Sequence, residues 1–545
     1  MTISPHETLL EKTSRTEPLT RILFFSADPI RANEWGAGLY EIANRISLTA
    51  TQYDAIETHY DEIGKIIDDS TDPRLREAHI FVQGSIRART AVLPRTGADG
   101  DHAEVDADVV VWLPRAGTDA MAVFKLVEDR LRAGTRTKTP PSLKNRCVRL
   151  HYKDESPPFH MDVTPARNAV GNIGSKGEGV LLVPDRSIKD WKDSAPLDYG
   201  DWFASVCDSV VTFDSAGVRY LEEHERKYGS ATQEPLPDHN AYIDFNPLRA
   251  AVKLLKAHRD GMFLHPSVSS LRPISIIITT LAARAYEKVA SESRSAPRNP
   301  GQVLIEIVER MPSFITGSTG SRVVANPVIR TPGFENFAEK WQSADGAALE
   351  HAFLAWHRDA LCAVRLGMWR FGTQARLDEA VRHAFGMRAT RNGPGFPAAL
   401  PYVYQSTMPT ARGPKEQFIE DHYPVDETHR YRVEIDCEER KGDTLVGSLR
   451  NRTRFNTWLP YNRKLRFKVV NCSVPPPYQL FWKVRNVGPV ADRTAQQRGE
   501  LIADKGSGFR DETTSFSGRH YVEAYVVKNG VCVARAKVDV PISSQ

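Results

Sequence analysis

The stretch that decides the fold is VDADVVVWLP, residues 105–114, which places two aspartates at the head of an apolar run. The apolar run predicts a buried β-strand, where Asp is a poor strand former and an unpaired charge is costly. Side chains two residues apart on a strand point to the same face, so Asp106 and Asp108 should converge. Two converging carboxylates require a cation between them, and hard oxygen ligands suit Mg²⁺, with Mn²⁺ as the alternative.

Two motifs on either side of this stretch predict the rest of a site. Downstream, Asp162 in FHMDVTPA opens a short strand that we expect beside the first. Three carboxylates on adjacent strands can hold two divalent ions about 3.5–4 Å apart. Upstream, Gly84 lets a phosphate approach the backbone, and Ser85 adds a hydroxyl to the exposed amides. This order of motifs predicts metal-dependent nucleotidyl transfer; acids that only cap strand ends at the surface are the alternative.

The period of the apolar residues changes along the chain and indicates several domains. Residues 37–69 predict one or two amphipathic helices, and the region from about 190 to 390 is again helical in pattern. Residues 388–425, rich in Pro, Gly and Arg, predict a linker. After about residue 429 the period becomes two, and Asn529-Gly530 between two alternating runs predicts a type I′ hairpin. We expect a mixed α/β lobe, a helical lobe and a C-terminal all-β sandwich.

Composition excludes several classes of protein. The 545 residues carry 72 basic and 68 acidic side chains, a balance that argues against nucleic-acid binding by the whole chain. The first 18 residues have no apolar core of a signal peptide, and no apolar stretch reaches the roughly 18–20 residues of a membrane span. The six cysteines show no CxxC spacing, which suits reduced thiols. We therefore expect a cytoplasmic protein without a zinc site.

The motifs together resemble a known family. GSIRART, EVDADVVVWL and FHMDVTPA resemble the polymerase-β-like nucleotidyltransferase superfamily, in particular the bacterial cGAS/DncV-like nucleotidyltransferases (CD-NTases, SMODS family). SLTATQYDAIETHYDEIG, VPDRSIKDWKDSAPLDYGDWF, LLKAHRD, PISIIITTLAARAY and NPVIRTPGFENFAEKW resemble further segments of that family. The tail, with YQLFWKVRNVG and SGRHYVEAYVVKNGVCVAR, is similar to the adenylyl/guanylyl-cyclase and SMODS C-terminal sensor domain. The resemblance covers about residues 35–390 and 415–545.

The resemblance implies a domain division and further site residues. It implies an N-terminal extension (1–35), a nucleotidyltransferase lobe (36–190), a helical lobe that completes a nucleotide cleft (191–400) and a β-sandwich sensor domain (415–545). It also implies that Lys256 reaches a triphosphate, with Lys253 as its rival, and that Ser275 lies near the same phosphates. Trp202 and Phe203 could stack on a base, although aromatic residues in this setting more often belong to the core.

The function implied is synthesis of a second messenger. NTPs (ATP, GTP or both) would be joined into a cyclic di- or trinucleotide for antiphage signalling. A linear oligonucleotide synthase, a transferase that modifies RNA or protein, and a non-catalytic nucleotide-binding sensor protein remain as alternatives. The sequence predicts neither base preference, nor the ligand of the C-terminal domain, nor the oligomeric state.

Three other features have plainer interpretations. GNIGSKGEG, residues 171–179, lacks the spacing of a phosphate-binding loop and predicts a flexible loop or hairpin. The basic stretch 136–153 predicts a solvated strand face and loop rather than a nucleic-acid groove. His160 predicts a histidine at a strand edge, since ion-activated chemistry needs no dedicated base.

Overall fold

The computed structural model describes residues 29–95, 105–134, 139–155, 158–214, 245–329, 335–343, 346–370, 374–386, 416–426, 430–441, 444–449, 459–486, 491, 496–515 and 518–542. The chain forms two compact units. The N-terminal unit comprises residues 32–365 and 381–397, and the C-terminal unit comprises residues 1–31, 366–380 and 398–545. Of the predicted extension 1–35, residues 1–28 lie outside the described residues, and the rest belong to helix α2 (Pro29–Arg45).

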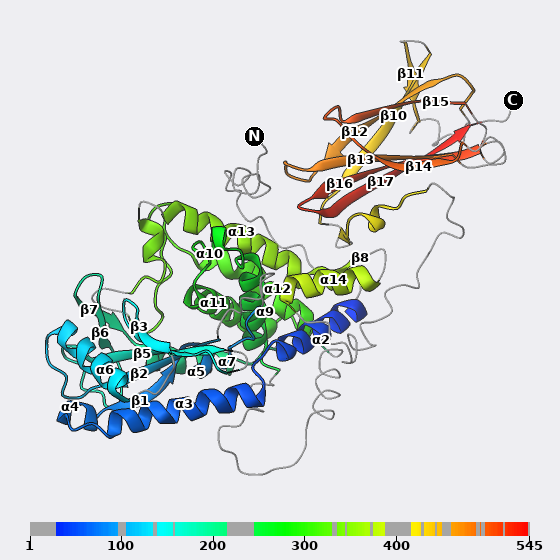
Figure 1. The fold of residues 1–545 in the computed structure, drawn as a ribbon. Coiled ribbons are helices and arrows are strands. Elements are labelled where there is room, and N and C mark those ends of the chain that lie inside the picture. The colour runs from blue at the N-terminus through cyan, green and yellow to red at the C-terminus, as the bar shows by residue number, and fades with distance from the viewer. Residues whose placement is uncertain are drawn as a thin grey trace. The chain divides into compact units, whose positions relative to one another are not determined.

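A mixed seven-stranded sheet forms the first half of the N-terminal unit (Figure 1). The strand order is β1–β2–β5–β4–β3, with β6 paired to β5 and β7 to β6. Strands β2 and β5 are parallel, and the other pairs are antiparallel. The strands are β1 (His79–Gln83), β2 (Val105–Trp112), β3 (Thr139–Leu143), β4 (Val148–Tyr152), β5 (Phe159–Asn168), β6 (Leu181–Asp185) and β7 (Asp190–Ser194).

The two faces of strand β2 have different neighbours. Val105, Ala107 and Val111 pack in one apolar cluster with helices α3 (Ala50–Asp68) and α6 (Ala120–Gly134). The alternate residues Val110 and Trp112 belong to a smaller cluster on the opposite face. Because side chains alternate along a strand, Asp106 and Asp108 share this second face and point away from the helix layer.

Helices build the second half of the N-terminal unit. Helix α9 is buried on nearly every side and packs against α7, α11, α12 and α13. Its N-terminus is set by Asn246, which caps the Arg249 amide, and by Pro247 at the first helical position. The elements of this half are α7 (Pro196–Cys207), α9 (Pro247–Met262), α10 (Pro266–Ser269), α11 (Ser275–Ser293), α12 (Pro300–Arg310), η2 (Met311–Phe314), η3 (Glu339–Gln342) and α13 (Gly346–Val364), whereas the short helices α4 (Pro73–Arg76) and α5 (Gly84–Arg87) belong to the sheet half. None of the described helices is long and apolar enough to cross a membrane.

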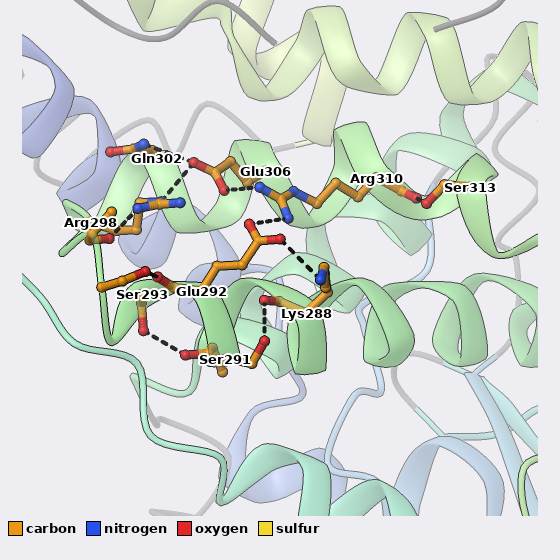
Figure 2. A network of polar contacts seen from close by, with 12 residues as sticks. Lys288, Ser291, Glu292, Ser293, Arg298, Gln302, Glu306, Arg310 and Ser313 are labelled. Carbon is orange, nitrogen blue, oxygen red and sulfur yellow. Dashed lines mark hydrogen bonds and ion pairs between the residues drawn. The ribbon is translucent and has the colours of Figure 1, made fainter. Parts of the chain in front are cut away.

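A buried ionic network joins α11 to α12 (Figure 2). Glu306 on α12 is 1% exposed and accepts hydrogen bonds from Arg298 Nε at 2.9 Å and Arg310 Nη2 at 2.8 Å. Arg310 also donates from Nη1 to Glu292 on α11 at 2.7 Å, and Lys288 lies 3.3 Å from the same carboxylate. The charge of Glu306 is thus matched inside the protein, a condition for burying it at all.

The C-terminal unit is a sandwich of two sheets around an apolar core, as predicted. The sheets have the orders β11–β10–β12–β15 and β14–β13–β16–β17–β9–β8. Asn529 and Gly530, with φ of 52° and 76°, join β16 to β17, so the predicted type I′ geometry is confirmed. The strands are β8 (Trp369–Arg370), β9 (Val425–Asp426), β10 (Val433–Lys441), β11 (Thr444–Ser448), β12 (Lys464–Cys472), β13 (Gln479–Arg485), β14 (Arg498–Ala503), β15 (Phe509–Thr513), β16 (Gly518–Lys528) and β17 (Val531–Ile542).

One strand of the larger sheet, β8, comes from a segment well upstream of the sandwich sequence. Strand β9 pairs parallel to β17, and β8, which follows the short helix η4 (Leu366–Met368), pairs antiparallel to β9. Helix α14 (Gln374–Phe385) comes next in the chain. Much of the predicted linker lies outside the described residues. Residues 416–425, however, are part of the sandwich through η5 (Ile419–Asp421) and β9. The prediction of a linker was therefore wrong for this segment.

Candidate active site

The three predicted acids meet on neighbouring strands. In the parallel pair β2–β5, Asp106 lies opposite His160 and Asp108 lies opposite Asp162. Ligand atoms of Asp106, His160 and Asp162 all lie within 4.8 Å of one another. Asp162 does not open its strand, as we expected, but is the fourth residue of β5, which begins at Phe159. The convergence itself follows from the strand periodicity.

Arg149 on β4 holds Asp162 from the other side. Its Nε and Nη2 donate to the two carboxylate oxygens of Asp162 at 2.7 Å each, and Nη2 lies 4.0 Å from Asp106 Oδ1. Asp162 is 8% exposed, so this bidentate pair supplies the partner that a buried carboxylate needs. Each carboxylate oxygen has a second lone pair, which leaves acceptor capacity toward a cation.

His160 is part of the acid cluster. Strand β5 lies between β2 and β4, so the expectation of a strand-edge histidine was wrong. Its Nε2 lies 2.9 Å from Oδ1 of Asp106. Partial desolvation inside the cavity would by itself raise the pKa of Asp106, but His160, Arg149 and the nearby Lys256 outweigh it and hold that pKa below the usual range. The sequence signal that could have indicated this role is the position of His160 two residues before Asp162, which places both side chains on the same face of the strand.

Asp108 has the opposite electrostatic environment. Its burial raises the pKa to about 8, and the charges of Asp106 and Asp162 add to the rise. Added positive charge would stabilise the deprotonated form of this carboxyl group. The oxygen-rich donor set of Asp106, Asp108 and Asp162 therefore fits a hard divalent ion such as Mg²⁺.

Gly84 and Ser85 lie directly against the acids. Gly84 follows β1, has φ of 60° and begins α5. A Cβ atom on Gly84 would lie 2.2 Å from Oδ2 of Asp108, so no side chain can be accommodated there without displacing that carboxylate. Ser85 Oγ donates to the backbone oxygen of Asp106 at 3.3 Å. The turn and the DxD strand are thus one structural unit.

Lys256 and Ser275 reach the same cavity from the helices. Lys256 on α9 lines the cavity and donates to the Thr90 carbonyl at 2.9 Å, whereas Lys253 is only 1% exposed. Burial, followed by the charge of Arg259, lowers the pKa of Lys256 to about 8. Ser275 Oγ accepts a hydrogen bond from Arg259 Nη1 at 2.7 Å. Arg259 also lines the cavity, and the sequence analysis did not single it out.

All these groups surround one cavity of about 750 Å³. Six of the seven predicted site residues line it: Gly84, Ser85, Asp106, Asp108, Lys256 and Ser275. Asp162 contributes from behind the lining, through the acid cluster. The aromatic residues of the lining are Tyr199 and Phe337, whose ring centroids are 5.9 Å apart. Phe203 is buried in the core, as expected for an aromatic residue in this setting, and neither Trp202 nor Phe203 lines the cavity.

The basic stretch differs in part from expectation, whereas the loop 171–179 agrees with it. Arg146 lines the cavity and donates to Asp185 at 3.0 Å, and Arg149 holds Asp162, so for these two residues the solvated-face prediction was wrong. Arg136 and Lys138 lie outside the described residues. The loop 171–179 is a hydrogen-bonded turn in which Asn172 Nδ2 donates to the carbonyls of Glu178 and Val180, rather than a phosphate-binding loop.

Comparisons with known proteins agree with this geometry. Residues 37–206 match the Second Messenger Oligonucleotide or Dinucleotide Synthetase domain (SMODS), and residues 414–543 match the Adenylyl/Guanylyl and SMODS C-terminal sensor domain (AGS_C). The chain therefore contains a SMODS domain and an AGS_C domain. The SMODS match includes five of the predicted site residues, Gly84, Ser85, Asp106, Asp108 and Asp162. The mixed sheet with its helices has the polymerase-β-like nucleotidyltransferase fold.

Individual relatives resemble the chain over part of its length. It is 28% identical over 268 residues to a protein named c-di-GMP synthase from Roseivirga ehrenbergii, an alignment that covers 47% of this chain and 62% of the relative. The chain thus spans less than two thirds of that relative's length. A solved CD-NTase, Bradyrhizobium diazoefficiens CdnG in complex with GTP, is 20% identical with a TM-score of 0.46, over 66% of this chain and 96% of the other. Vibrio cholerae DncV cyclic AMP-GMP synthase is 17% identical with a TM-score of 0.37, over 66% and 87% of the two chains.

Proposed function

We propose that the chain is a Mg²⁺-dependent nucleotidyltransferase that joins nucleoside triphosphates into a cyclic oligonucleotide. The observation that carries the proposal is the meeting of Asp106, Asp108 and Asp162 on adjacent strands at a cavity that also contains Lys256. The match of residues 37–206 to the SMODS domain supports the same reaction class. Divalent ions held by the three acids would lower the pKa of the attacking hydroxyl and neutralise charge on the phosphates.

The proposed reaction is attack of one nucleotide's ribose hydroxyl on the α-phosphate of another. A new P–O bond forms, the bond between the α- and β-phosphates breaks, the hydroxyl loses its proton and pyrophosphate leaves. A second attack of the same kind closes the ring of a dinucleotide. The relative named c-di-GMP synthase and the DncV cyclic AMP-GMP synthase support a cyclic dinucleotide product and GTP among the substrates.

The side chains around the cavity would divide the work between phosphates and base. The ammonium group of Lys256 would act as a point charge on the triphosphate, with Gly84 and Ser85 providing close backbone approach. Arg259 would keep Ser275 oriented toward the same phosphates through their 2.7 Å hydrogen bond. The base would stack at Tyr199 and Phe337, because these are the aromatic side chains of the cavity lining.

The wider role follows from the two domains together. A cyclic nucleotide product is a second messenger, and we place its synthesis in the cytoplasm as part of antiphage signalling. None of the six cysteines, all of which are among the described residues, forms a disulfide bond, which suits a reducing compartment. The AGS_C domain would bind a ligand that controls synthesis.

Product analysis with all four NTPs tests the proposal. Purified protein is incubated with labelled NTPs and Mg²⁺ or Mn²⁺, the mixture is digested with phosphatase, and the remaining label is identified by mass spectrometry. A phosphatase-resistant cyclic product that disappears in the Asp106→Asn/Asp108→Asn variant is expected. A product that phosphatase degrades completely would instead favour a linear synthase. Nucleotide binding without any product, the same in both proteins, would favour the non-catalytic sensor.

A further inference from the structure

Asp106 is an exposed member of the acid cluster, and it lies beside the buried ring of His160. The Asp106 side chain is 54% exposed, whereas the His160 side chain beside it is 8% exposed. His160 lies on the central strand β5, directly opposite Asp106 in the β2–β5 register. A buried ring fixed by two flanking strands thus contacts an acid that would otherwise rotate freely in the cavity.

We propose that His160 is a positioning residue that fixes the Asp106 carboxylate for divalent-ion binding, an inference that rests on the proposed function. The 2.9 Å contact from Nε2 engages only Oδ1 of Asp106, so Oδ2 remains available as a ligand. Holding the carboxylate in one rotamer before the ion arrives removes part of the ordering entropy that binding would otherwise cost. Partners of metal ligands commonly act in this way, and their loss lowers metal affinity about 10–100-fold.

The neighbouring pair shows the same arrangement. Arg149, on the strand at the other side of β5, holds both oxygens of Asp162 through a cross-strand contact. Asp106 and Asp162 therefore each have a fixed partner from an adjacent strand. Asp108, two residues along β2 from Asp106, lies opposite Asp162 in the β2–β5 register. These fixed partners explain how acids can be arranged before an ion is present.

Two other roles for His160 are distinguishable from positioning. As a general base it would take a proton from the attacking hydroxyl, but its Nε2 already lies 2.9 Å from the Asp106 carboxylate. As a metal ligand it would have to release that contact and bind the ion through nitrogen. Positioning alone predicts a change in ion affinity that disappears when the ion is saturating.

Mn²⁺ binding to the nucleotide-free, full-length protein tests the inference. His160→Phe keeps a ring of similar size but removes the donor, and we expect it to weaken Mn²⁺ binding about 10–100-fold, measured by electron paramagnetic resonance or calorimetry. His160→Gln can place an amide near the Nε2 position and should stay within about threefold of the wild type. The matched control is His151→Gln: His151 pairs with His160 across β4–β5, but its Nε2 lies 2.9 Å from Ser142 Oγ.

Each outcome decides between the roles. At saturating Mn²⁺, product formation by His160→Phe should return to within about threefold of the wild type, because ion affinity is the property that positioning changes. A persistent loss of turnover at saturating ion would overturn positioning in favour of a general base. Unchanged Mn²⁺ affinity in His160→Phe, or nitrogen hyperfine coupling to Mn²⁺ that vanishes in this variant, would also overturn it. Altered Mn²⁺ affinity without any product from the wild type would support the inference while refuting the proposed synthesis.

Discussion

A Cβ atom on Gly84 would lie 2.2 Å from Oδ2 of Asp108, closer than any real contact between these atoms allows. The φ of 60° at Gly84 is also a left-handed conformation that side-chain-bearing residues rarely adopt. The glycine of the turn and the second aspartate of the DxD motif therefore constrain each other. The two motifs approach each other so closely in space that no side chain fits at position 84. Their order in the sequence alone does not show this close approach.

Gly84→Ala should abolish most of the activity while leaving the fold intact. The methyl group must displace the Asp108 carboxylate, and a displacement of about 1 Å at a reacting centre can reduce the rate about 100-fold. Steady-state product formation at saturating Mg²⁺ and NTP measures the effect. Gly64→Ala is the matched control, because a Cβ at this position in α3 meets no atom within 4 Å. Equal activity of both variants would contradict the steric argument.

Ion binding should depend on pH through Asp108. Its pKa of about 8 means that the carboxyl is mostly protonated below that pH, and it must lose the proton to bind an ion. Mn²⁺ affinity should therefore rise about tenfold per pH unit from pH 6 toward pH 8 and then level off. Calorimetry across this range measures the slope, and Asp108→Asn should flatten it. A flat wild-type profile would place the pKa of Asp108 in its ordinary range.

The same carboxyl should affect stability in the opposite direction. Because its folded-state pKa is raised above 3.8, the folded protein binds more protons than the unfolded chain between about pH 4 and pH 8. The ion-free protein should therefore lose stability as pH rises through this window. Asp108→Asn should raise the ion-free melting temperature at pH 8, although it weakens ion binding. Thermal melts of both proteins at pH 5 and pH 8, with and without Mn²⁺, would show the crossover.

Lys256 should make triphosphate binding fall at alkaline pH. Its pKa is lowered to about 8, so the ammonium charge that attracts phosphate is lost as pH rises above that value. Affinity for a non-hydrolysable NTP analogue should fall between pH 8 and pH 9.5 in the wild type. Lys256→Arg keeps its charge over this range and should remove the fall, whereas Lys256→Met should bind about tenfold more weakly even at pH 7. Lys65→Met, on the exposed face of α3, should behave as the wild type.

The buried network between α11 and α12 should be essential for stability. Glu306→Gln leaves Arg298 and Arg310 without their shared carboxylate, and breaking a buried ion pair in this way costs about 3–5 kcal/mol. Urea denaturation of the full chain, followed by Trp fluorescence, measures the change. Glu287→Gln is the comparison, since the Glu287–Arg284 pair is about one-third exposed and should contribute less than about 1 kcal/mol. Similar losses in both variants would mean that burial does not decide the contribution.

The acid cluster could be predicted because local rules determine it. Strand periodicity places Asp106 and Asp108 on one face, and the parallel neighbour brings Asp162 beside them. His160 follows the same periodicity but was interpreted as an edge residue, because the sequence does not show that β5 lies at the centre of the sheet. Tyr199 and Phe337 are 138 positions apart in the sequence, and only the folded helices and loop bring their rings together.

The sandwich shows the same limit at the level of the fold. The Asn529-Gly530 hairpin was predicted because its turn chemistry is contained in two residues. The pairing of β8 with β9 could not be predicted, because it joins residues 369–370 to residues 425–426 across the stretch assigned to a linker. Short strands of two residues also carry no periodicity of their own.

The participation of β8 in the C-terminal sheet has a consequence for how this module can be exchanged or expressed alone. A gene fragment that begins at residue 414, where the AGS_C match starts, encodes β9 but omits the strand that covers its outer edge. Unpaired strand edges template association with other chains, so such a fragment should oligomerise or misfold. Transfer of this domain to another protein therefore requires residues 366–380 as well, because the domain is built from separate segments of the chain.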